Sequence, residues 1–338
     1  MKYLPVTVES IEQAAVILRG GGIVAFPTET VYGLGADAFN AQAIAKIFEV
    51  KGRPHFDPLI IHIAATEALE NVANLSLLSE EARKKLFLLA ENLMPGPLSI
   101  ILPKNEKIPA IASAGLPTAA IRFPSHPAAI KLISLCGGAL AAPSANPFGS
   151  LSPTRAEHVR DKLGDKIDMI LDGGQTQIGL ESTVLDITGQ RVKILRPGGT
   201  TKEAIEKLIG NVDDGFLSAK TDAPLSPGQL KSHYAPLKPL SALSRQDILR
   251  QSYEKDSAFL FFDSGTRDEW ISSQKPPKTA VFRVLSESGQ ALTAAGRLFE
   301  ILHELENCSI LRIFAQFAPA EGLGEAINDR LRRGSVLS

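Results

Sequence analysis

The sequence predicts an α/β protein built from two domains. A chain of 338 residues is usually divided between two domains, each with a core of its own. Short apolar runs bounded by glycine or proline alternate with amphipathic stretches that follow capping residues, which is the pattern of strands alternating with helices. We therefore expect a larger α/β domain followed by a smaller one. The pattern leaves open whether the larger sheet is parallel or mixed.

The N-terminal elements follow from their caps and apolar runs. Ser10, with a glutamine three residues later, resembles a capping box and predicts a helix over residues 12–19. GGIVAF, residues 21–26, predicts a short buried strand. Asn40 predicts the start of a second helix, which Gly52 ends. Further strands are predicted for the runs PLIIHI, LSIIL, TAAIRF, ALAA, DMILD, TVLDI and VKILR.

The chain changes character after residue 210. Residues 211–238 contain several prolines and little apolar periodicity, which is typical of a linker, and linkers of this length often act as lids. Beyond it, SAFLFF, TAVFRV and SILRIFAQF predict strands around the helical stretch GQALTAAGRLFEILHELE. The predicted organisation is a larger domain over residues 1–210, a linker or lid over 211–238 and a small α/β domain over 239–338.

Composition excludes several classes of function. A net charge of −1 provides no general attraction for nucleic acid or for a membrane surface. The N-terminus MKYLPVTVES has no long apolar run, and we find no uninterrupted apolar run long enough to span a bilayer. Cys136 and Cys308 lie in apolar surroundings, so we expect buried thiols in a reducing cytoplasm rather than a disulfide or a metal pair.

Four segments place small polar or basic residues where a predicted strand or helix ends. In open α/β sheets, ligands bind in crevices made by such loops. The residues concerned are Thr28, Glu29, Thr30 and Tyr32 in PTETVY, Lys51 and Arg53 in KGRPHFDP, Ser144, Asn146, Ser152 and Thr154 in APSANPFGSLSPT, and Ser182 and Arg196 in GLESTVLD and LRPGG.

Each of these segments also has a purely structural interpretation. Lys51 and Arg53 could complement a helix dipole. Ser144 and Asn146 could be turn formers, and His62 in LIIHI could be a core histidine with its hydrogen bonds satisfied.

Arg122 is harder to explain structurally, because a charged group in an apolar strand needs a partner or a ligand. Together with Lys51, Arg53 and Arg196 it would form an anion site able to hold a triphosphate. The pair GK does not occur, so a Walker A loop is excluded.

One motif argues for a different cofactor but fails in context. Residues 33–38, GLGADA, match the GxGxxA form of the dinucleotide fingerprint. A true fingerprint follows its strand directly, whereas PTETVY intervenes here and Asn40 caps the helix. We therefore do not expect a nicotinamide or flavin site.

Taken in order, these segments resemble one family. FPTETVYGLGADA, KGRPHFDPLIIHI, AIRFP, APSANPFGSLSPT, GLESTVLD and ILRPGG are similar to the YrdC-type threonylcarbamoyl-AMP synthases. SPGQLKSHYAP and the small C-terminal domain resemble the two-domain form. The chain departs from the pattern at Asp57, where asparagine is common, and at Ala142, where threonine is often found. The resemblance implies an open, twisted YrdC-like sheet with a concave face and a Rossmann-like C-terminal domain.

The resemblance also implies a reaction. L-threonine, bicarbonate and ATP would give threonylcarbamoyl-AMP and pyrophosphate, with Mg²⁺ carried by ATP and no dedicated metal site. A downstream tRNA threonylcarbamoyl transferase complex would take the product, as the first step of threonylcarbamoyladenosine modification of tRNA. The enzyme would be cytoplasmic, with weak RNA binding possible and no membrane partner.

Site residues carry over from the same resemblance. Those expected to bind L-threonine are Thr30, His62, Arg122, Ala142 through its backbone, and Ser182. Those expected to bind ATP are Lys51, Arg53, Asp57, Thr118, Ser144, Asn146, Ser152, Arg196 and Tyr234, the last from the linker.

Two other interpretations remain open on the sequence. A concave basic surface could bind double-stranded RNA without catalysis, which would give steep salt dependence. Another carboxylate-activating or carbamoyl-transfer enzyme could share the fold and use a different acceptor.

Overall fold

The computed structural model describes residues 1–216 and 233–335. These residues cluster into two compact units. The N-terminal unit contains residues 1–148, 153–177 and 181–216, and the C-terminal unit contains 149–152, 178–180 and 233–335. The predicted linker falls mainly on residues 217–232, which lie outside the described residues, so the predicted domain boundaries stay predictions.

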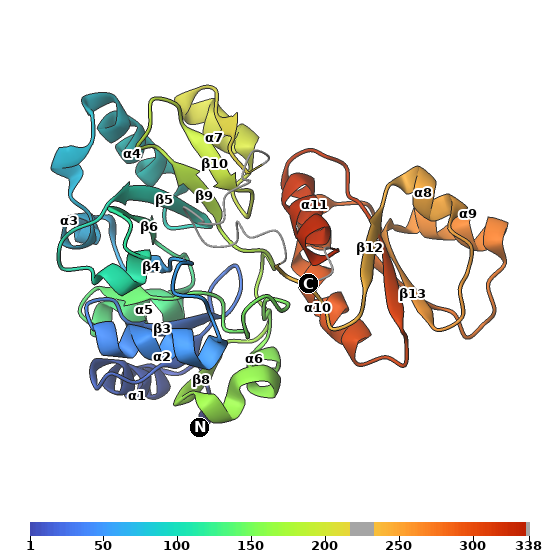
Figure 1. Ribbon diagram of the computed structural model, residues 1–338, viewed down its shortest axis with the longest axis horizontal. Coiled ribbons are helices and arrows are strands. Elements are labelled where there is room, and N and C mark those ends of the chain that lie inside the picture. Colours follow the sequence, from blue (N-terminus) through green and yellow to red (C-terminus); the bar gives the residue numbers. More distant parts are fainter. Residues whose placement is uncertain (217–232, 336–338) are drawn as a thin grey trace. The chain divides into compact units, whose positions relative to one another are not determined.

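The described part of the N-terminal unit forms an 11-stranded sheet in the order β1-β8-β2-β3-β7-β4-β6-β5-β9-β10-β11 (Figure 1). Its sheet is mixed: β4 and β6 are parallel, whereas β5 and β6 are antiparallel. The strands are β1 (Lys2–Pro5), β2 (Val24–Phe26), β3 (Gly33–Asp37), β4 (Ile60–Ile63), β5 (Leu98–Pro103), β6 (Thr118–Arg122), β7 (Ala139–Ala141), β8 (Met169–Asp172), β9 (Thr183–Asp186), β10 (Lys193–Arg196) and β11 (Asp213–Asp214).

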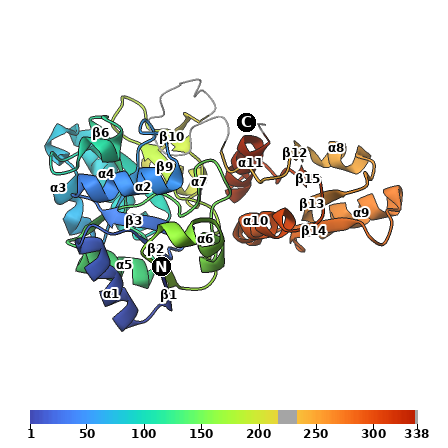
Figure 2. The same ribbon diagram turned by 60° about the horizontal axis from the view of Figure 1, so that its bottom comes forward.

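Helices cover both faces of this sheet, because alternate residues of its buried strands point to opposite sides. Val24 and Phe26 pack with α1 and α5, whereas Ile23 and Ala25 face the larger core that α2 completes. Figure 2 shows α1 and α5 on one side of β3 and α2 on the other. The helices are α1 (Val8–Arg19), α2 (Ala41–Lys51), α3 (Leu69–Val72), α4 (Glu80–Leu93), α5 (Pro127–Leu135), α6 (Ala156–Leu163) and α7 (Lys202–Ile209).

Two local predictions are decided by capping. α2 begins after Asn40, whose side chain accepts from the N–H groups of the next turn, and ends at Gly52 with φ 62°, as predicted. α1 begins earlier than predicted, because Thr7 is its cap and Ser10 is the reciprocal partner of Thr7 in the capping box. The capping box is therefore formed by Thr7 and Ser10 and not by Ser10 and Gln13.

The glycine pair of GLGADA lies in a strand and not in a turn. β3 runs antiparallel to β2, with Gly33 opposite Phe26. A Cβ atom at Gly35 would lie 2.8 Å from the Phe26 ring, so the aromatic ring occupies the space that a side chain would need. The segment is thus a packed strand, which agrees with the rejection of a dinucleotide fingerprint.

The C-terminal unit has a four-stranded sheet in the order β12-β15-β13-β14, in which every described pairing is parallel. α8 and α9 lie on one side of the sheet and α10 and α11 on the other (Figure 1). This is the Rossmann-like arrangement that the family resemblance implied. Phe259, Phe261 and Trp270 pack together in its core. The elements are β12 (Leu240–Leu243), α8 (Arg245–Arg250), β13 (Ser257–Asp263), α9 (Ser264–Gln274), β14 (Val281–Ser286), α10 (Ala291–Glu306), β15 (Arg312–Gln316) and α11 (Leu323–Gly334).

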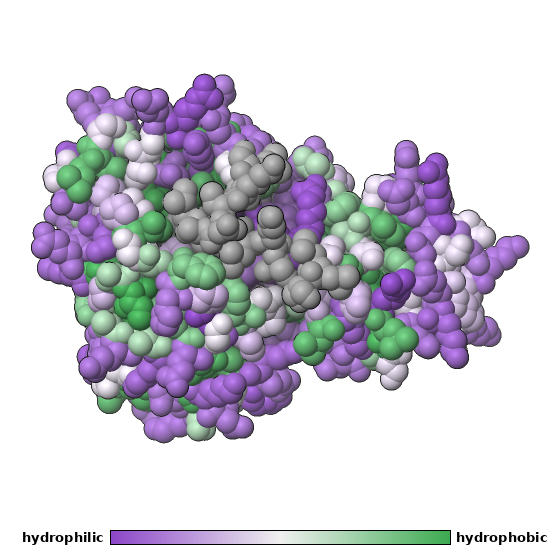
Figure 3. Space-filling view, viewed as in Figure 1, coloured by the Kyte–Doolittle hydropathy of each residue, from purple (hydrophilic) through white to green (hydrophobic). Residues whose placement is uncertain are grey.

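Within the described ranges, no helix combines the length and the apolar composition that crossing a membrane requires. On the face shown in Figure 3, hydrophilic residues predominate and hydrophobic ones form small patches. Cys136 is a buried free thiol, as expected, whereas the free thiol Cys308 is partly exposed.

Candidate active site

Four polar side chains form a row across the central strands of the N-terminal unit. The strand register pairs His62 of β4 with Arg122 of β6, and Arg122 with Ser99 of β5. Ser182, directly before β9, lies beside Ser99, with 2.8 Å between the two hydroxyl oxygens. Neighbouring residues in register project to the same face of a sheet. The row therefore gathers three of the residues predicted to bind threonine, together with Ser99, which the sequence did not single out.

Arg122 forms side-chain hydrogen bonds through one terminal nitrogen and none through the other among the described residues. Its guanidinium is buried, and Nη2 donates to Oε1 of Glu29 at 2.8 Å and to the hydroxyl oxygen of Thr30 at 2.9 Å. No described residue accepts a hydrogen bond from Nη1. A guanidinium fixed in this way presents an N–H edge that suits a carboxylate.

The hydroxyl groups of PTETVY have fixed hydrogen-bond directions. Thr28 donates its only hydroxyl proton to the carbonyl of Val31 at 2.6 Å. The 2.8 Å contact between the hydroxyls of Thr28 and Thr30 must therefore be donated by Thr30. Because a hydroxyl has one proton and two lone pairs, Thr30 keeps only acceptor capacity for a ligand.

His62 is a neutral imidazole in this site. Burial, followed by the nearby Arg122 charge, lowers its pKa to about 3. Its Nδ1 lies 3.3 Å from the carbonyl oxygen of Ile60, so Nδ1 carries the proton and donates. The other nitrogen, Nε2, is left as an acceptor.

This buried histidine should make stability depend on pH. In the unfolded chain a histidine has a pKa of about 6.5, so between that value and about 3 the unfolded state binds a proton that the folded state does not. The contribution of His62 to stability is therefore fully present above the pKa of the unfolded state, and it is lost as the pH falls below that pKa. From pH 7 to pH 5 we expect His62 alone to lower the free energy of unfolding by about 2 kcal/mol.

Urea unfolding of the wild type and of His62→Asn at both pH values measures this contribution. Between pH 7 and pH 5, the free energy of unfolding of the variant should fall by about 2 kcal/mol less than that of the wild type. His55→Asn, which changes an exposed histidine, is the matched control and should keep the pH dependence of the wild type. An equal pH dependence in wild type and His62→Asn would contradict the assignment.

Lys51 connects two of the predicted ATP-binding segments. It is the last residue of α2 and is buried, and its Nζ donates to the carbonyl of Ser144 at 2.6 Å and to that of Asn146. Burial lowers the pKa of Lys51, and the neighbouring Arg53 adds to the effect. Lys51 therefore fixes the backbone of the Ser144 loop, a role that a helix-dipole interaction would not require.

The remaining basic residues surround one buried carboxylate. Arg53 forms an ion pair with Asp57, with 2.9 Å between Nη2 and Oδ2. Burial raises the pKa of Asp57, while the charges of Arg53, Lys51 and Arg196 oppose the rise. Three cations around one acid leave a surplus of positive charge, which is what a polyphosphate site needs.

Arg196 also reaches the polar row. Its Nη2 donates to the carbonyl of Ser182 at 2.8 Å and to the Ser182 hydroxyl at 3.1 Å. Ser182 thus lies between Ser99 on one side and Arg196 on the other. The predicted threonine and nucleotide residues therefore meet at Ser182.

Two other predicted site residues of this unit, Thr118 and Ala142, are not members of the row of polar side chains. Thr118 begins β6 and Arg122 ends it, so the two lie at opposite ends of one strand. The backbone N–H of Ala142 donates to Ile60 at 2.9 Å, so its backbone can contact a ligand only through the carbonyl.

Ser152 and Tyr234 belong to the C-terminal unit. The carbonyl of Ser152 accepts from His303 Nε2 at 3.1 Å. Tyr234 has φ 62° and is buried, with its ring centroid 5.8 Å from that of Phe299 and 4.8 Å from the Arg330 guanidinium. Neither contact tests the predicted ATP role of either residue.

Sequence reasoning missed the roles of Ser99 and Glu29. Ser99 lies in LSIIL, where a serine interrupts an apolar run, and this is the only signal that could have been used. Glu29 was noted as part of PTETVY, but its pairing with Arg122, 93 residues away, depends on which strands are neighbours.

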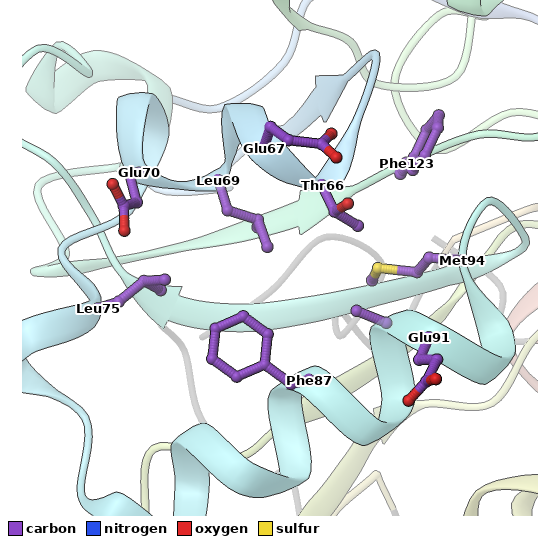
Figure 4. Close-up of a pocket in the computed structure, with 10 residues that line it drawn as sticks. Thr66, Glu67, Leu69, Glu70, Leu75, Phe87, Glu91, Met94 and Phe123 are labelled. Carbon is purple, nitrogen blue, oxygen red and sulfur yellow. The ribbon is translucent and has the colours of Figure 1, made fainter.

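A separate cavity of about 740 Å³ in the same unit does not suit a nucleotide. Figure 4 shows Leu69, Phe87 and Met94 pointing into it. Glu67, Glu70 and Glu91 also line it, and their carboxylates would repel phosphate groups. Among residues 1–216 and 233–335, no three His, Cys, Asp or Glu side chains are grouped to hold a metal ion.

Comparison with known proteins identifies the family. The family model for Sua5, YciO and YrdC, described as telomere recombination, matches residues 16–198. A second model, described as the C-terminal domain of threonylcarbamoyl-AMP synthase, matches residues 200–335. The chain belongs to the threonylcarbamoyl-AMP synthase family. Together the two models cover nearly all of the sequence, as the resemblance of its motifs implied.

Individual family members agree along most of their length. The threonylcarbamoyl-AMP synthase of Pyrococcus abyssi (strain GE5 / Orsay) is 40% identical over 328 residues, covering 96% of this chain and 94% of the relative. That of Bacillus subtilis (strain 168) is 41% identical over 337 residues, covering 96% and 92%. The crystal structure of P. abyssi Sua5 complexed with L-threonine matches with a TM-score of 0.87 and 37% identity, covering 99% and 97%. These matches confirm the predicted fold and enzyme class, and they disfavour a non-catalytic RNA-binding module.

Proposed function

We propose that this enzyme converts L-threonine, bicarbonate and ATP into threonylcarbamoyl-AMP and pyrophosphate. The observation that carries the proposal is the position of Ser182. It joins the Arg122 row, which offers an N–H edge to a carboxylate, to Arg196, which belongs to the group of cations suited to a triphosphate. The L-threonine bound in the P. abyssi Sua5 structure supports the amino-acid half of the proposal.

Each side chain of the row has a role that its hydrogen bonds allow. Nη1 of Arg122 would donate to the threonine carboxylate. Nε2 of His62, an acceptor at neutral pH, would accept from the threonine hydroxyl. Ser182, Thr30 and the Ala142 carbonyl would complete the pocket. Since a site built to pair a hydroxyl rejects an analogue without it, the pocket should favour threonine over valine.

The chemistry relies on position and charge. The threonine amine and bicarbonate give a carbamate and water, and a carbamate oxygen then attacks the α-phosphorus of ATP, which releases pyrophosphate. Lys51, Arg53 and Arg196 would neutralise the charge of the phosphates, and Mg²⁺ bound to the triphosphate would add to this neutralisation. Such transfers depend mainly on alignment and electrostatic stabilisation.

The other residues expected to bind ATP keep that role in the proposal. Asp57, Thr118, Ser144, Asn146, Ser152 and Tyr234 are proposed to contact ATP. The linker over residues 211–238 is proposed to exclude water from the labile mixed anhydride.

A transferase that modifies tRNA would consume the product, because the activated carbonyl requires an acceptor amine. The free thiols of Cys136 and Cys308 are in keeping with a reducing cytoplasm. Direct RNA contact would be weak, since the net charge is −1.

The test is pyrophosphate release by the purified protein with ATP, magnesium, bicarbonate and L-threonine. Release that requires both bicarbonate and threonine, and that falls when valine replaces threonine, is the expected result. Release without bicarbonate would instead favour a different carboxylate-activating enzyme. If no pyrophosphate is released and the protein binds RNA in a salt-sensitive way, the result would favour a double-stranded RNA-binding module without catalysis.

Tyr234→Ala should weaken the binding of ATP more than the binding of threonine. We expect the KM for ATP to rise about tenfold or more and that for threonine to change by less than about threefold. Tyr234→Phe keeps the ring against Phe299 and Arg330 and is the control for packing. A larger effect on threonine than on ATP would show that Tyr234 does not act at the nucleotide.

A further inference from the structure

Glu29 carries a hydrogen-bonding capacity that the fold does not use. Its carboxylate is buried with 3% of the residue exposed, and Oε1 accepts from Arg122. The second oxygen, Oε2, is buried without a hydrogen-bond partner among the described residues. Leaving such an acceptor unpaired costs free energy, and in native proteins an unpaired buried group often indicates a functional role.

The surroundings of this oxygen favour a donor as its partner. The hydroxyl proton of Thr30 is directed to Thr28, so Thr30 offers a ligand only lone pairs. Two acceptors, Oε2 of Glu29 and the hydroxyl oxygen of Thr30, therefore lie around the Arg122 guanidinium. A ligand group that satisfies both must carry several N–H or O–H donors, and an ammonium group has three.

Glu29 and Arg122 together present opposite charges side by side. Arg122 offers Nη1, for which no described residue is an acceptor, and Glu29 offers Oε2. An α-amino acid at neutral pH carries a carboxylate and an ammonium on the same carbon. The pair is therefore complementary in charge to the ammonium and carboxylate of an amino acid, independent of its side chain.

We propose that Glu29 binds the α-ammonium group of the amino-acid substrate, and that Glu29 and Arg122 together select a zwitterion. The inference rests on the proposed function, in which this site binds L-threonine. It assigns the amine to Glu29, the carboxylate to Arg122 and the side-chain hydroxyl to His62. Glu29 is thus a determinant of specificity, in addition to holding Arg122.

The test compares three ligands that differ by one group. L-threonine has both charges, threoninol lacks the carboxylate, and 3-hydroxybutyrate lacks the amine. Binding is followed by ligand-detected NMR titration, which measures millimolar Kd values, without ATP or bicarbonate. The proteins are the wild type, Glu29→Gln and Arg122→Lys, with the midpoint of thermal unfolding as a check on folding.

The two variants should show crossed patterns. Glu29→Gln should raise the Kd for threonine and for threoninol about tenfold or more, and it should change the Kd for 3-hydroxybutyrate by less than about twofold. Arg122→Lys should raise the Kd for threonine and for 3-hydroxybutyrate and leave the Kd for threoninol unchanged. If Glu29→Gln weakens all three ligands equally, Glu29 only positions Arg122, and the proposal is wrong. Unchanged threonine binding by Glu29→Gln would also overturn it.

The wild type provides a second test that needs no variant. It should bind threonine at least about tenfold more tightly than 3-hydroxybutyrate, and equal affinities would refute a site for the ammonium. A wild type that binds no threonine would contradict the proposed function itself. A wild type that binds threonine and releases pyrophosphate, with Glu29→Gln binding threonine equally well, would overturn only the role of Glu29.

Discussion

Replacing Arg122 with alanine is expected to abolish the use of L-threonine. The substitution removes the N–H edge that would bind the carboxylate, and it leaves the Glu29 carboxylate buried without its cation. Breaking a buried ion pair by removing one partner costs about 3–5 kcal/mol. That cost falls on the stability of the fold. The lost charged hydrogen bond to the substrate carboxylate costs about 2–5 kcal/mol of binding free energy, so kcat/KM for threonine should fall by about 10²–10³-fold or more.

Pyrophosphate release at saturating ATP and bicarbonate measures the effect. Arg191→Ala is the matched control, because Arg191 is exposed and forms a surface ion pair with Asp213 at 3.4 Å. Arg122→Met combined with Glu29→Gln separates folding from binding, since it removes both buried charges at similar volume. We expect this double variant to recover stability but not turnover. Near-normal turnover by Arg122→Ala would end the role assigned to Arg122.

Gly198→Ala is expected to destabilise the fold strongly. A Cβ atom at this position would lie 2.3 Å from the Glu181 carbonyl oxygen, 2.5 Å from the Ser182 carbonyl carbon and 2.5 Å from the Thr183 nitrogen. All three are backbone atoms, which no change of rotamer can move. The start of β9 must therefore shift, and we expect a loss of at least about 3 kcal/mol in the free energy of unfolding.

The same shift should affect the site. Displacing Ser182 would separate it from Ser99 and from Arg196, so the KM for threonine should rise in whatever fraction of Gly198→Ala folds. Urea unfolding and threonine kinetics measure the two effects. Gly189→Ala is the matched control, because the nearest atom to its added Cβ would be the Arg191 carbonyl oxygen at 3.6 Å. If Gly198→Ala unfolds within about 1 kcal/mol of the wild type, the close packing is not what requires glycine.

Much of the candidate site could be predicted, because its motifs are local. Asn40 and Gly52 define α2 by capping chemistry, and α2 brings Lys51 to its C-terminus. Arg122 could be singled out because a charge in an apolar strand is rare in any fold. Lys51 and Ser144 were each expected to bind ATP from the family resemblance, whereas their contact, a buried ammonium that donates to two carbonyls of the Ser144 loop, comes from the structure.

Residues whose roles depend on strand order could not be predicted. Ser99 is an ordinary strand serine until β5 is placed between β6 and β9. Glu29 becomes part of the site because its loop reaches Arg122 at the end of β6. The GxGxxA match could be rejected from the sequence, but only the structure shows that Gly33 and Gly35 lie in a strand packed against the Phe26 ring.

The sequence by itself determined the α/β class, the caps of α2, the family and the chemical types of the site residues. These follow from short-range propensities and from motifs that keep their order along the chain. Tertiary structure alone decided the mixed strand order, the row from His62 to Ser182 and the pairing of Glu29 with Arg122. The physical reason is that register and strand neighbours are set by contacts between distant segments, and shifting one strand by a single residue would turn that strand's member of the row to the other face.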